Sequence, residues 1–254
     1  MHRLGAEAEE AKRAMAICNV KLKRKWEVAE GTMAFQFEKP DGFKFKAGQF
    51  GDFTLSHPSE TDAEGNLRGF SLASAPFERD LVVATRMRDT AFKRVLKTMD
   101  LGAELSMDAP YGSLTLHEDA SIPAVFLTGG IGITPVRSII LQATHEKLPH
   151  KLLLFDSNRR PEDAAFLDEL TAAQNVNPNF TLVGTMTQME KSTESWDGQT
   201  GFVTTAMLRT FIPDLALPIY YLSGPRTMVA GMRKALSDAG VKDDKIRTEE
   251  FTGY

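Results

Sequence analysis

The residue pattern of this chain changes near residue 117, and this change constrains its fold more than any other feature. Residues 16–116 hold short runs of apolar and β-branched residues separated by turn sequences such as Pro40-Asp41-Gly42. After the polar stretch 117–121, apolar runs alternate with segments of helical spacing. Many short strands predict a small antiparallel barrel, whereas strand–helix alternation predicts a parallel sheet with helices on both faces. The predicted parts are a helical extension at 1–15, a β-barrel domain at 16–118 and an α/β domain at 119–254.

One helix is expected among the strands of the first half. Apolar residues at helical spacing from Phe92 to Met99 predict a helix at 91–98, and Asp89 and Thr90 are expected to cap it. The strands expected before and after this helix are 17–26, 33–38, 49–55, 70–74, 81–87 and 104–107. In the second half the expected strands are 124–128, 151–156, 181–186, 219–223 and 246–251, and the expected helices are 136–147, 164–175, 205–211 and 228–239.

A glycine-rich turn follows the first apolar run of the second half. The run 122–128 leads directly into Gly129-Gly-Ile-Gly-Ile-Thr-Pro135. Glycines at a strand-to-helix turn leave no side chain between the backbone and a ligand, and the following helix points its free N–H groups at the turn. Pro135 suits the first turn of that helix. The pattern favours a bound pyrophosphate, although a tight turn that binds nothing has the same pattern. Ser223-Gly224-Pro225 ends a later strand, so both motifs fall on the sheet edge where ligands bind.

The motif Arg68-Gly-Phe-Ser71 lies about sixty residues before the glycine turn. A guanidinium can hold a phosphate with two hydrogen bonds, an aromatic ring can lie flat against a planar ligand, and a hydroxyl can bond a ring nitrogen. Alternation along a strand puts Phe70 and Ser71 on opposite sides, unless a bend brings both to one ligand. Alone, these four residues also suit a strand with no binding function.

Composition narrows the chemistry that the chain can perform. The net charge of −4 and the mixed signs give no footprint for nucleic-acid binding. No run approaches the roughly 18 apolar residues that a membrane span needs, and acidic residues near Met1 argue against a secretion signal, so a cytoplasmic protein is expected. The single cysteine, Cys18, cannot supply an iron–sulfur cluster, and the five histidines lack metal-ligand spacing, so no metal is expected. Redox chemistry would therefore need a bound organic cofactor.

Taken together, these motifs resemble the ferredoxin–NADP reductase superfamily. Its pattern is Arg-x-Tyr/Phe-Ser/Thr, then Gly-Gly-x-Gly-x-x-Pro, then Cys-Gly-Pro, then a C-terminal segment with an acid and an aromatic residue. The matching segments, which spread the resemblance over residues 16–254, are 68–71, 129–135, 223–225 and 249–254. The resemblance implies a flavin-binding barrel, a nicotinamide-nucleotide domain, FAD (or less readily FMN) as cofactor, and NADPH or NADH as electron donor.

The resemblance also assigns roles to single residues. It implies that Arg68 contacts the flavin phosphate region, that Phe70 packs on the isoalloxazine, and that Ser71 bonds near N5. The implied catalytic residues are Ser71, Ser223 and Phe251. The implied flavin contacts are Arg68, Gly69, Phe70, Ser71, Thr85, Arg86, Met87, Thr90, Ala91, Phe92, Lys93 and Tyr254, and the implied nucleotide contacts are Thr128, Gly129, Gly130, Thr134, Arg159, Gly224, Pro225 and Met228.

Several alternatives stay open at the cofactor sites. The family often has a glycine-rich stretch before the barrel helix, and this chain has residues 88–93 there instead. Two alternatives follow from this departure. Either Lys93 and Arg86 would hold the FAD pyrophosphate, or the flavin would be FMN. Ser223 replaces the usual cysteine beside the nicotinamide, and either Phe251 or Tyr254 covers the flavin.

Selectivity between NADPH and NADH is also open. Arg159 and Arg160 would grip a 2′-phosphate, whereas Asp156 would favour a free ribose hydroxyl.

The resemblance implies a flavin-dependent NAD(P)H oxidoreductase. Hydride would pass from NAD(P)H to FAD N5, and electrons would then reach a separate acceptor such as a ferredoxin or another iron–sulfur protein. The alternatives are a reductase subunit of a larger complex, a free-flavin or ferric reductase, and a non-catalytic flavin-binding sensor. The sequence holds no signature of the acceptor.

Overall fold

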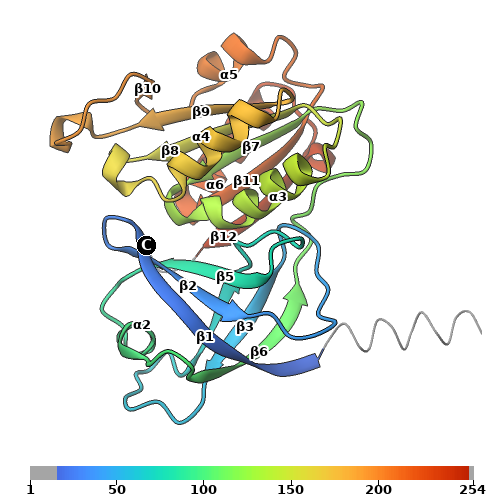
Figure 1. Cartoon of the computed structure of the whole chain (residues 1–254). Coiled ribbons are helices and arrows are strands. Elements are labelled where there is room, and N and C mark those ends of the chain that lie inside the picture. The colour runs from blue at the N-terminus through green and yellow to red at the C-terminus, as the bar shows by residue number, and fades with distance from the viewer. Residues whose placement is uncertain (1–15, 252–254) are drawn as a thin grey trace, which may run out of the picture.

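The computed structural model describes residues 16–251 and shows two halves stacked one on the other (Figure 1). The first half is a six-stranded antiparallel sheet in the order β4-β3-β6-β1-β2-β5. Its ends meet where the Ala73 N–H, just after β4, donates to the Val82 carbonyl of β5 at 2.8 Å, so the sheet curls into the predicted barrel. Its strands are β1 (Ala16–Ala29), β2 (Thr32–Glu38), β3 (Phe50–Leu55), β4 (Leu67–Ser71), β5 (Asp80–Arg86) and β6 (Glu104–Tyr111).

The barrel interior is filled by side chains that alternate along its strands. In β3, Phe53 and Leu55 point inward and are buried, while Thr54 between them is partly exposed. The helix α2 (Ala91–Thr98) closes one side of the barrel by inserting Phe92 and Leu96 into this core. The rings of Phe53, Phe70 and Phe92 form a chain of contacts across the core, with centroids 5.8 and 5.9 Å apart.

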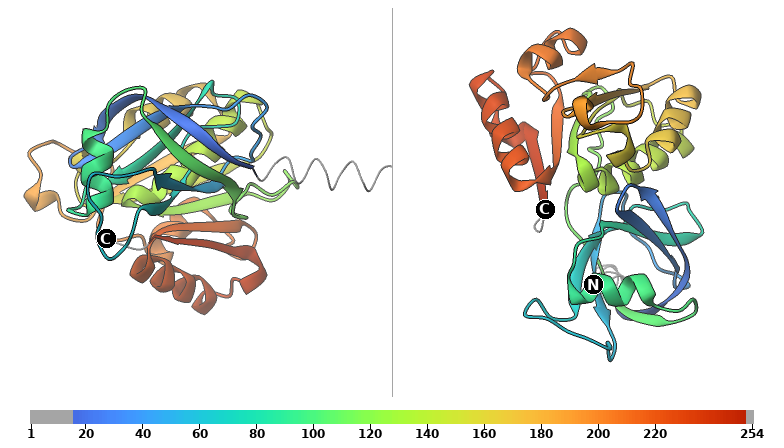
Figure 2. Two further views of the ribbon diagram at one scale, coloured as in Figure 1. Left: turned by 90° about the horizontal axis from the view of Figure 1, so that it is seen from below. Right: turned by 90° about the vertical axis from the view of Figure 1, so that its left-hand side faces the viewer.

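The second half is a six-stranded parallel sheet in the order β10-β9-β8-β7-β11-β12. All residues of β7 are buried, as expected for a central strand covered on both faces. Helices α3 and α4 pack on one face and α5 and α6 on the other (Figure 2). The elements are β7 (Ala124–Gly129), α3 (Ile133–His145), β8 (Leu152–Asn158), α4 (Leu167–Val176), β9 (Phe180–Met186), β10 (Gln199–Thr200), α5 (Thr205–Phe211), β11 (Ile219–Pro225), α6 (Arg226–Asp238) and β12 (Ile246–Phe251), with short 3₁₀ turns η1 (Gly130–Gly132), η2 (Pro161–Asp163), η3 (Met189–Lys191) and η4 (Asp243–Lys245).

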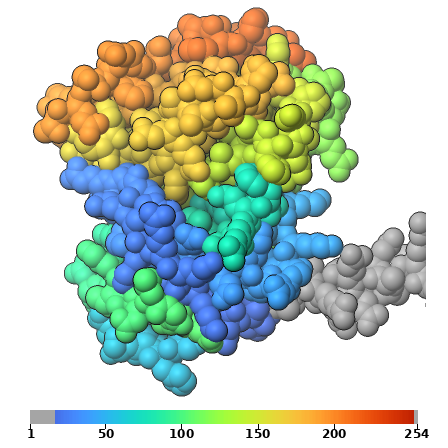
Figure 3. Space-filling model, viewed as in Figure 1, coloured from blue at the N-terminus to red at the C-terminus, as the bar shows by residue number. Residues whose placement is uncertain are grey.

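The two halves lie against each other (Figure 3). Polar and aromatic side chains meet between them. Arg137 and Ser138 of α3 donate hydrogen bonds to the carbonyls of Ala73 and Ser74 in the barrel, at 2.5 and 2.7 Å. The ring of Phe77 stacks on His145 with a centroid distance of 3.9 Å. These contacts tie the barrel to α3, the helix that follows the glycine turn.

Most predicted elements are confirmed within a few residues, and the differences have physical causes. Helix α4 begins at Leu167 because Phe166 has a left-handed backbone, with φ of 62°, that separates it from η2. The predicted cap of α2 is wrong in part: Thr90 occupies the N-cap position, but its side chain caps nothing, and Asp62 accepts the Ala91 N–H at 2.7 Å instead. Strand β10 was not predicted, and the proposed extension at 1–15 lies outside the described residues. Among residues 16–251, no helix combines the length and the apolar character needed to cross a membrane.

Candidate active site

Two cavities adjoin at the interface between the barrel and the parallel sheet. The first, here called the barrel cavity, has a volume of about 360 Å³. The second, here called the sheet-edge cavity, has a volume of about 640 Å³ and lies at the carboxyl ends of the parallel strands. The barrel cavity is lined by Glu64, Arg68, Gly69, Phe70, Ser71, Ala84, Thr85, Arg86, Arg88, Thr90, Lys93, Ile131 and Phe251.

The lining of the barrel cavity is rich in positive charge. Arg68, Arg86, Arg88 and Lys93 all contribute to its lining. Burial, together with the charges of Arg88 and Arg68, lowers the pKa of the Lys93 ammonium to about 8. The Thr90 hydroxyl is buried there and has no hydrogen-bond partner within residues 16–251. A cluster of cations with an unpaired hydroxyl is a setting that favours an anionic ligand.

A bend brings Phe70 and Ser71 to the same cavity. Up to Ser71 the chain pairs with β3, and immediately afterwards Ala73 pairs with β5. The strand therefore leaves one neighbour for another at this point, and strict alternation of side chains ends. Both residues are buried, and both line the barrel cavity.

Glu249 is a site residue that the sequence analysis did not assign. The Ser71 hydroxyl donates to Glu249 Oε1 at 2.8 Å, which joins the barrel to β12 across 178 residues of chain. Burial raises the pKa of the Glu249 carboxyl, and the hydrogen bond from Ser71 opposes this rise. Glu249 pairs in register with Ser223 of β11, whose buried hydroxyl has no partner within the described residues. The Ser71 hydroxyl and a carboxyl whose pKa is raised by burial thus meet at the barrel cavity, whose lining also includes Phe251.

The sheet-edge cavity lies where the strand order reverses, between β7 and β11. Here Gly130 has a φ of 52°, and Gly132 packs so closely that an added Cβ would lie 2.2 Å from the Ser223 carbonyl oxygen. The glycines of the turn are therefore required by both conformation and space. The lining residues of this cavity are Arg86, Gly129, Gly130, Ser157, Asn158, Arg159, Asp163, Thr187, Phe202, Val203, Thr204, Thr205, Pro225, Thr227, Met228, Gly231, Met232 and Ala235.

Three residues proposed for nucleotide selectivity differ sharply in their positions. Arg159 lines the sheet-edge cavity. Arg160 lines neither cavity and pairs with Asp163 of η2 at 3.0 Å and with Glu30 of the barrel half at 2.8 Å. Asp156 is buried and accepts hydrogen bonds from Thr128 and Asn158, at 2.6 and 2.8 Å, so its proposed contact with a ribose hydroxyl is wrong. Burial raises the pKa of Asp156 to about 6 despite these bonds.

The two cavities share one wall. Arg86 lines both of them, and Ile131, which lines the barrel cavity, follows Gly130 of the sheet-edge cavity. Ligands that fill the two cavities would therefore approach each other at Arg86 and at the turn 130–131.

Several predicted site residues support the cavities without lining them. Phe92 belongs to the barrel core, and the Thr128 and Thr134 hydroxyls donate to Asp156 and to the Ile131 carbonyl. Gly224 packs against Gly129. The predicted residues that line neither cavity are Met87, Ala91, Phe92, Thr128, Thr134, Ser223 and Gly224, whereas Tyr254 lies outside the described residues.

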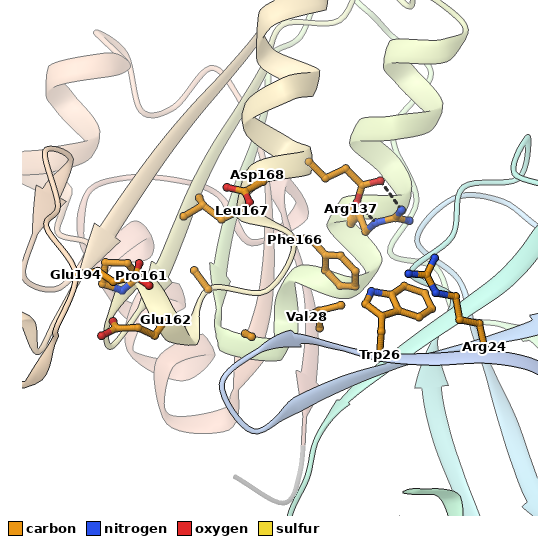
Figure 4. A pocket seen from close by; sticks show the side chains of 13 residues that line it. Arg24, Trp26, Val28, Arg137, Pro161, Glu162, Phe166, Leu167, Asp168 and Glu194 are labelled. Carbon is orange, nitrogen blue, oxygen red and sulfur yellow. Dashed lines mark hydrogen bonds and ion pairs between the residues drawn. The ribbon is translucent and has the colours of Figure 1, made fainter. Parts of the chain in front are cut away.

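A third cavity, of about 520 Å³, shares no lining residue with the other two. In Figure 4, Trp26 and Arg24 extend from β1 toward Phe166 and Arg137 of the α/β half. The Arg24 guanidinium lies over the Trp26 ring, and that of Arg137 lies over the Phe166 ring, at 4.7 and 5.0 Å. None of the predicted site residues lines this cavity, which belongs to the interface between the halves.

Comparisons with known proteins agree with this architecture. Residues 126–234 match the family described as Oxidoreductase NAD-binding domain. The glycine betaine monooxygenase reductase subunit of Chromohalobacter salexigens is 26% identical over 238 residues, which are 92% of this chain and 63% of that protein. The chain spans between about half and just under two-thirds of the length of the curated relatives it matches.

Solved structures extend the likeness to the whole fold. The cytochrome P450 reductase GcoB of Amycolatopsis superposes with a TM-score of 0.79 at 21% identity, covering 94% of this chain and 71% of that one. A ferredoxin NADP+ reductase of Neisseria gonorrhoeae, solved with FAD and NADP, gives a TM-score of 0.75 at 21% identity, covering 92% and 98%. The matched domain and the superpositions together show that the chain has the two-domain fold of ferredoxin–NADP reductase-like proteins, with an oxidoreductase NAD-binding domain match in its second half.

Proposed function

We propose that this chain is a flavin-dependent NAD(P)H oxidoreductase that passes electrons to a separate acceptor. In this proposal residues 16–118 form the flavin-binding half, and residues 119–254 form the half that binds the nicotinamide nucleotide. The observation that carries the proposal is the shared wall between the barrel cavity and the sheet-edge cavity, formed by Arg86 with Ile131 next to Gly130. Two cofactors that exchange electrons must meet, and this fold has two cavities that meet.

The residues of the barrel cavity fit a flavin with a phosphate. Its lining offers Arg68, Arg86 and Lys93 to a phosphate or pyrophosphate, and the Thr90 hydroxyl, which has no partner among residues 16–251, can donate to the same group. The same lining offers Phe70, Ser71 and Phe251 to a planar ring system. FAD bound there would supply the conversion between a two-electron donor and one-electron acceptors.

The remaining roles fall to the side chains between the cavities. Ser71 can hydrogen-bond a ring nitrogen, and Glu249, held 2.8 Å from the Ser71 hydroxyl, can keep or release a proton there. Ser223 presents a buried hydroxyl on the strand next to Glu249. Gly129, Gly130, Pro225 and Met228 line the space for the nicotinamide nucleotide, and Phe251 is the aromatic residue proposed to cover the flavin.

The acceptor is proposed to be a protein. Relatives of this chain are named as reductase components of monooxygenases, in Chromohalobacter salexigens and in Rhodococcus jostii, and these names favour an iron–sulfur or oxygenase partner over a small acceptor. We retain the sequence-based prediction that the protein works in the cytoplasm.

The first test is an absorbance spectrum of the purified protein, followed by anaerobic addition of NADH and then NADPH. Flavin absorbance bands at ~450 nm that bleach when a nucleotide is added support the proposal. The nucleotide that bleaches them more readily is the preferred donor. A yellow protein that neither nucleotide bleaches would instead indicate a flavin-binding sensor. A colourless protein that takes up no added flavin would refute the proposed function.

The Arg68→Ala variant tests where the flavin phosphate lies. We expect the flavin content after gel filtration to fall about tenfold or more, because a guanidinium–phosphate contact is lost. The Arg79→Ala variant is a matched control, since Arg79 lies outside both cavities. Full flavin occupancy in Arg68→Ala would contradict the placement.

A further inference from the structure

The loop between β3 and β4, residues 56–66, places acidic side chains beside Arg68 of the barrel cavity and beside the start of α2. Asp62 Oδ2 accepts the Ala91 N–H at 2.7 Å, at the first residue of α2. Glu64 Oε2 lies 2.8 Å from Arg68 Nη2, and Asp62 Oδ1 lies 3.7 Å from the same nitrogen. The Arg68 guanidinium and the N-terminus of α2, which would suit a flavin phosphate, are therefore each already in contact with a carboxylate of this loop.

Carboxylate and phosphate oxygens bind such groups in the same way. Both accept from the fork of a guanidinium and from the free N–H groups of a helix N-terminus. The Ala91 N–H lowers the pKa of Asp62, so this side chain is an anion at neutral pH. A flavin phosphate must therefore share or displace these carboxylates before it can use Arg68 and the start of α2.

The loop is placed so that displacement is easy. The side chains of Asp62 and Glu64 are 31% and 65% exposed, and exposed ion pairs add little stability. Lys93 differs from Arg68, because within residues 16–251 no carboxylate lies at ion-pair distance from its Nζ, which donates to the Arg86 carbonyl at 2.7 Å. A phosphate could therefore pair with Lys93 without displacing a carboxylate, but it would compete with Asp62 and Glu64 for Arg68.

From this arrangement we infer that the loop 56–66 is a built-in competitor for the flavin phosphate. Asp62 and Glu64 hold the phosphate-binding groups when the flavin leaves and weaken the anchoring of FMN and FAD. The flavin is thus held exchangeably rather than as a permanently retained group. This inference rests on the proposed flavin function, and it makes Asp62 and Glu64 determinants of how tightly phosphorylated flavins bind.

The test compares flavin affinity in the unmodified chain and in the double variant Asp62→Asn/Glu64→Gln. Dissociation constants for FAD, FMN and riboflavin are measured by the recovery of flavin fluorescence on serial dilution of the flavin-loaded proteins. Because two competing charges are removed, the dissociation constants of FAD and FMN are expected to fall about three- to tenfold. Riboflavin, which has no phosphate, is expected to change by less than about twofold.

Glu60→Gln is the matched control within the same loop. Glu60 pairs with Arg94 on the outer side of α2, at 2.6 Å, and lines neither cavity. This variant is expected to bind all three flavins as the unmodified chain does. Thermal unfolding of each variant checks that the barrel is intact.

The possible results separate the inference from the proposed function. Tighter binding of FAD and FMN, with unchanged binding of riboflavin, supports the inference that the loop competes with the flavin phosphate. Unchanged or weaker FAD binding in the double variant would overturn it while leaving the flavin function in place, because the carboxylates would then order the site rather than compete for it. Equal tightening of riboflavin would also overturn it, since the effect would not involve the phosphate. Failure of every variant to bind any flavin would refute both.

Discussion

Arg137 joins the two halves of the molecule, and its replacement gives a quantitative test of their interface. The side chain is 6% exposed. It donates five hydrogen bonds, two to Glu169 of α4 at 2.7 Å, two to Glu78 of the barrel at 3.0 and 3.3 Å, and one to the Ala73 carbonyl at 2.5 Å. The Arg137→Met substitution keeps an unbranched side chain beside Phe166 but leaves both carboxylates without their common partner.

The expected cost follows from the exposure of those carboxylates. Breaking a buried ion pair by removing one partner costs about 3–5 kcal/mol. Because Glu78 and Glu169 are 25% and 42% exposed, water can solvate them in part, and the lower limit applies. We therefore expect Arg137→Met to lower the free energy of unfolding by about 3 kcal/mol, which for a chain of this size lowers Tm by roughly 6–12 °C.

Urea unfolding followed by circular dichroism measures this change. The control is Arg233→Met, which removes an exposed pair with Asp243 at 3.5 Å and should cost less than about 0.5 kcal/mol. A double-mutant cycle of Arg137→Met with Glu78→Gln isolates the coupling across the interface. If Arg137→Met costs no more than the control, the interface is not held by this side chain, and the reasoning fails.

Three further predictions concern the site and its surroundings. Glu249→Gln should slow NAD(P)H oxidation about tenfold or more and should remove the pH dependence that the raised pKa of Glu249 gives the rate; an unchanged pH profile would argue against a proton role. The ordinary pKa of an aspartate is 3.8, and burial raises the pKa of Asp156 to about 6 in the folded protein. The free energy of unfolding should therefore fall as pH rises from about 4 to 6, whereas below pH 4 Asp156 should make no contribution to its pH dependence. Asp156→Asn should lack this loss, on the order of 3 kcal/mol, when urea midpoints at pH 4 and 7 are compared with those of the unmodified chain. Arg159→Ala should lower the ratio of NADPH to NADH affinity about tenfold in a binding titration, because only NADPH carries a 2′-phosphate; an unchanged ratio would place that phosphate elsewhere.

Local patterns in the sequence predicted the elements well because local physics determines them. The helix at 91–98 was predicted with its observed bounds, since the spacing of Phe92 and Leu96 follows the 3.6-residue period of a helix that covers an apolar core. The glycine turn was placed correctly at the sheet edge, because parallel strands align their carboxyl ends.

Contacts between distant residues could not be predicted in this way. The cap of α2 comes from Asp62, 29 residues earlier, and no local signal distinguishes that aspartate from its acidic neighbours. Glu249 meets Ser71 only because β12 pairs with β11 and the two halves are packed together. The acidic residue near the C-terminus was noted as part of a motif, but its partner needed the three-dimensional fold.

Arg86 lines both cavities, and this position has a thermodynamic consequence. Its guanidinium lies 3.3 Å from Asp163, which also pairs with Arg160 and so keeps a partner when Arg86 moves. A ligand that draws Arg86 into one cavity changes the surface that it offers to the other. By thermodynamic linkage, the factor by which the first ligand changes the affinity of the second equals the factor by which the second changes the affinity of the first. The order in which flavin and nucleotide arrive then leaves the final equilibrium the same and alters only the route to it.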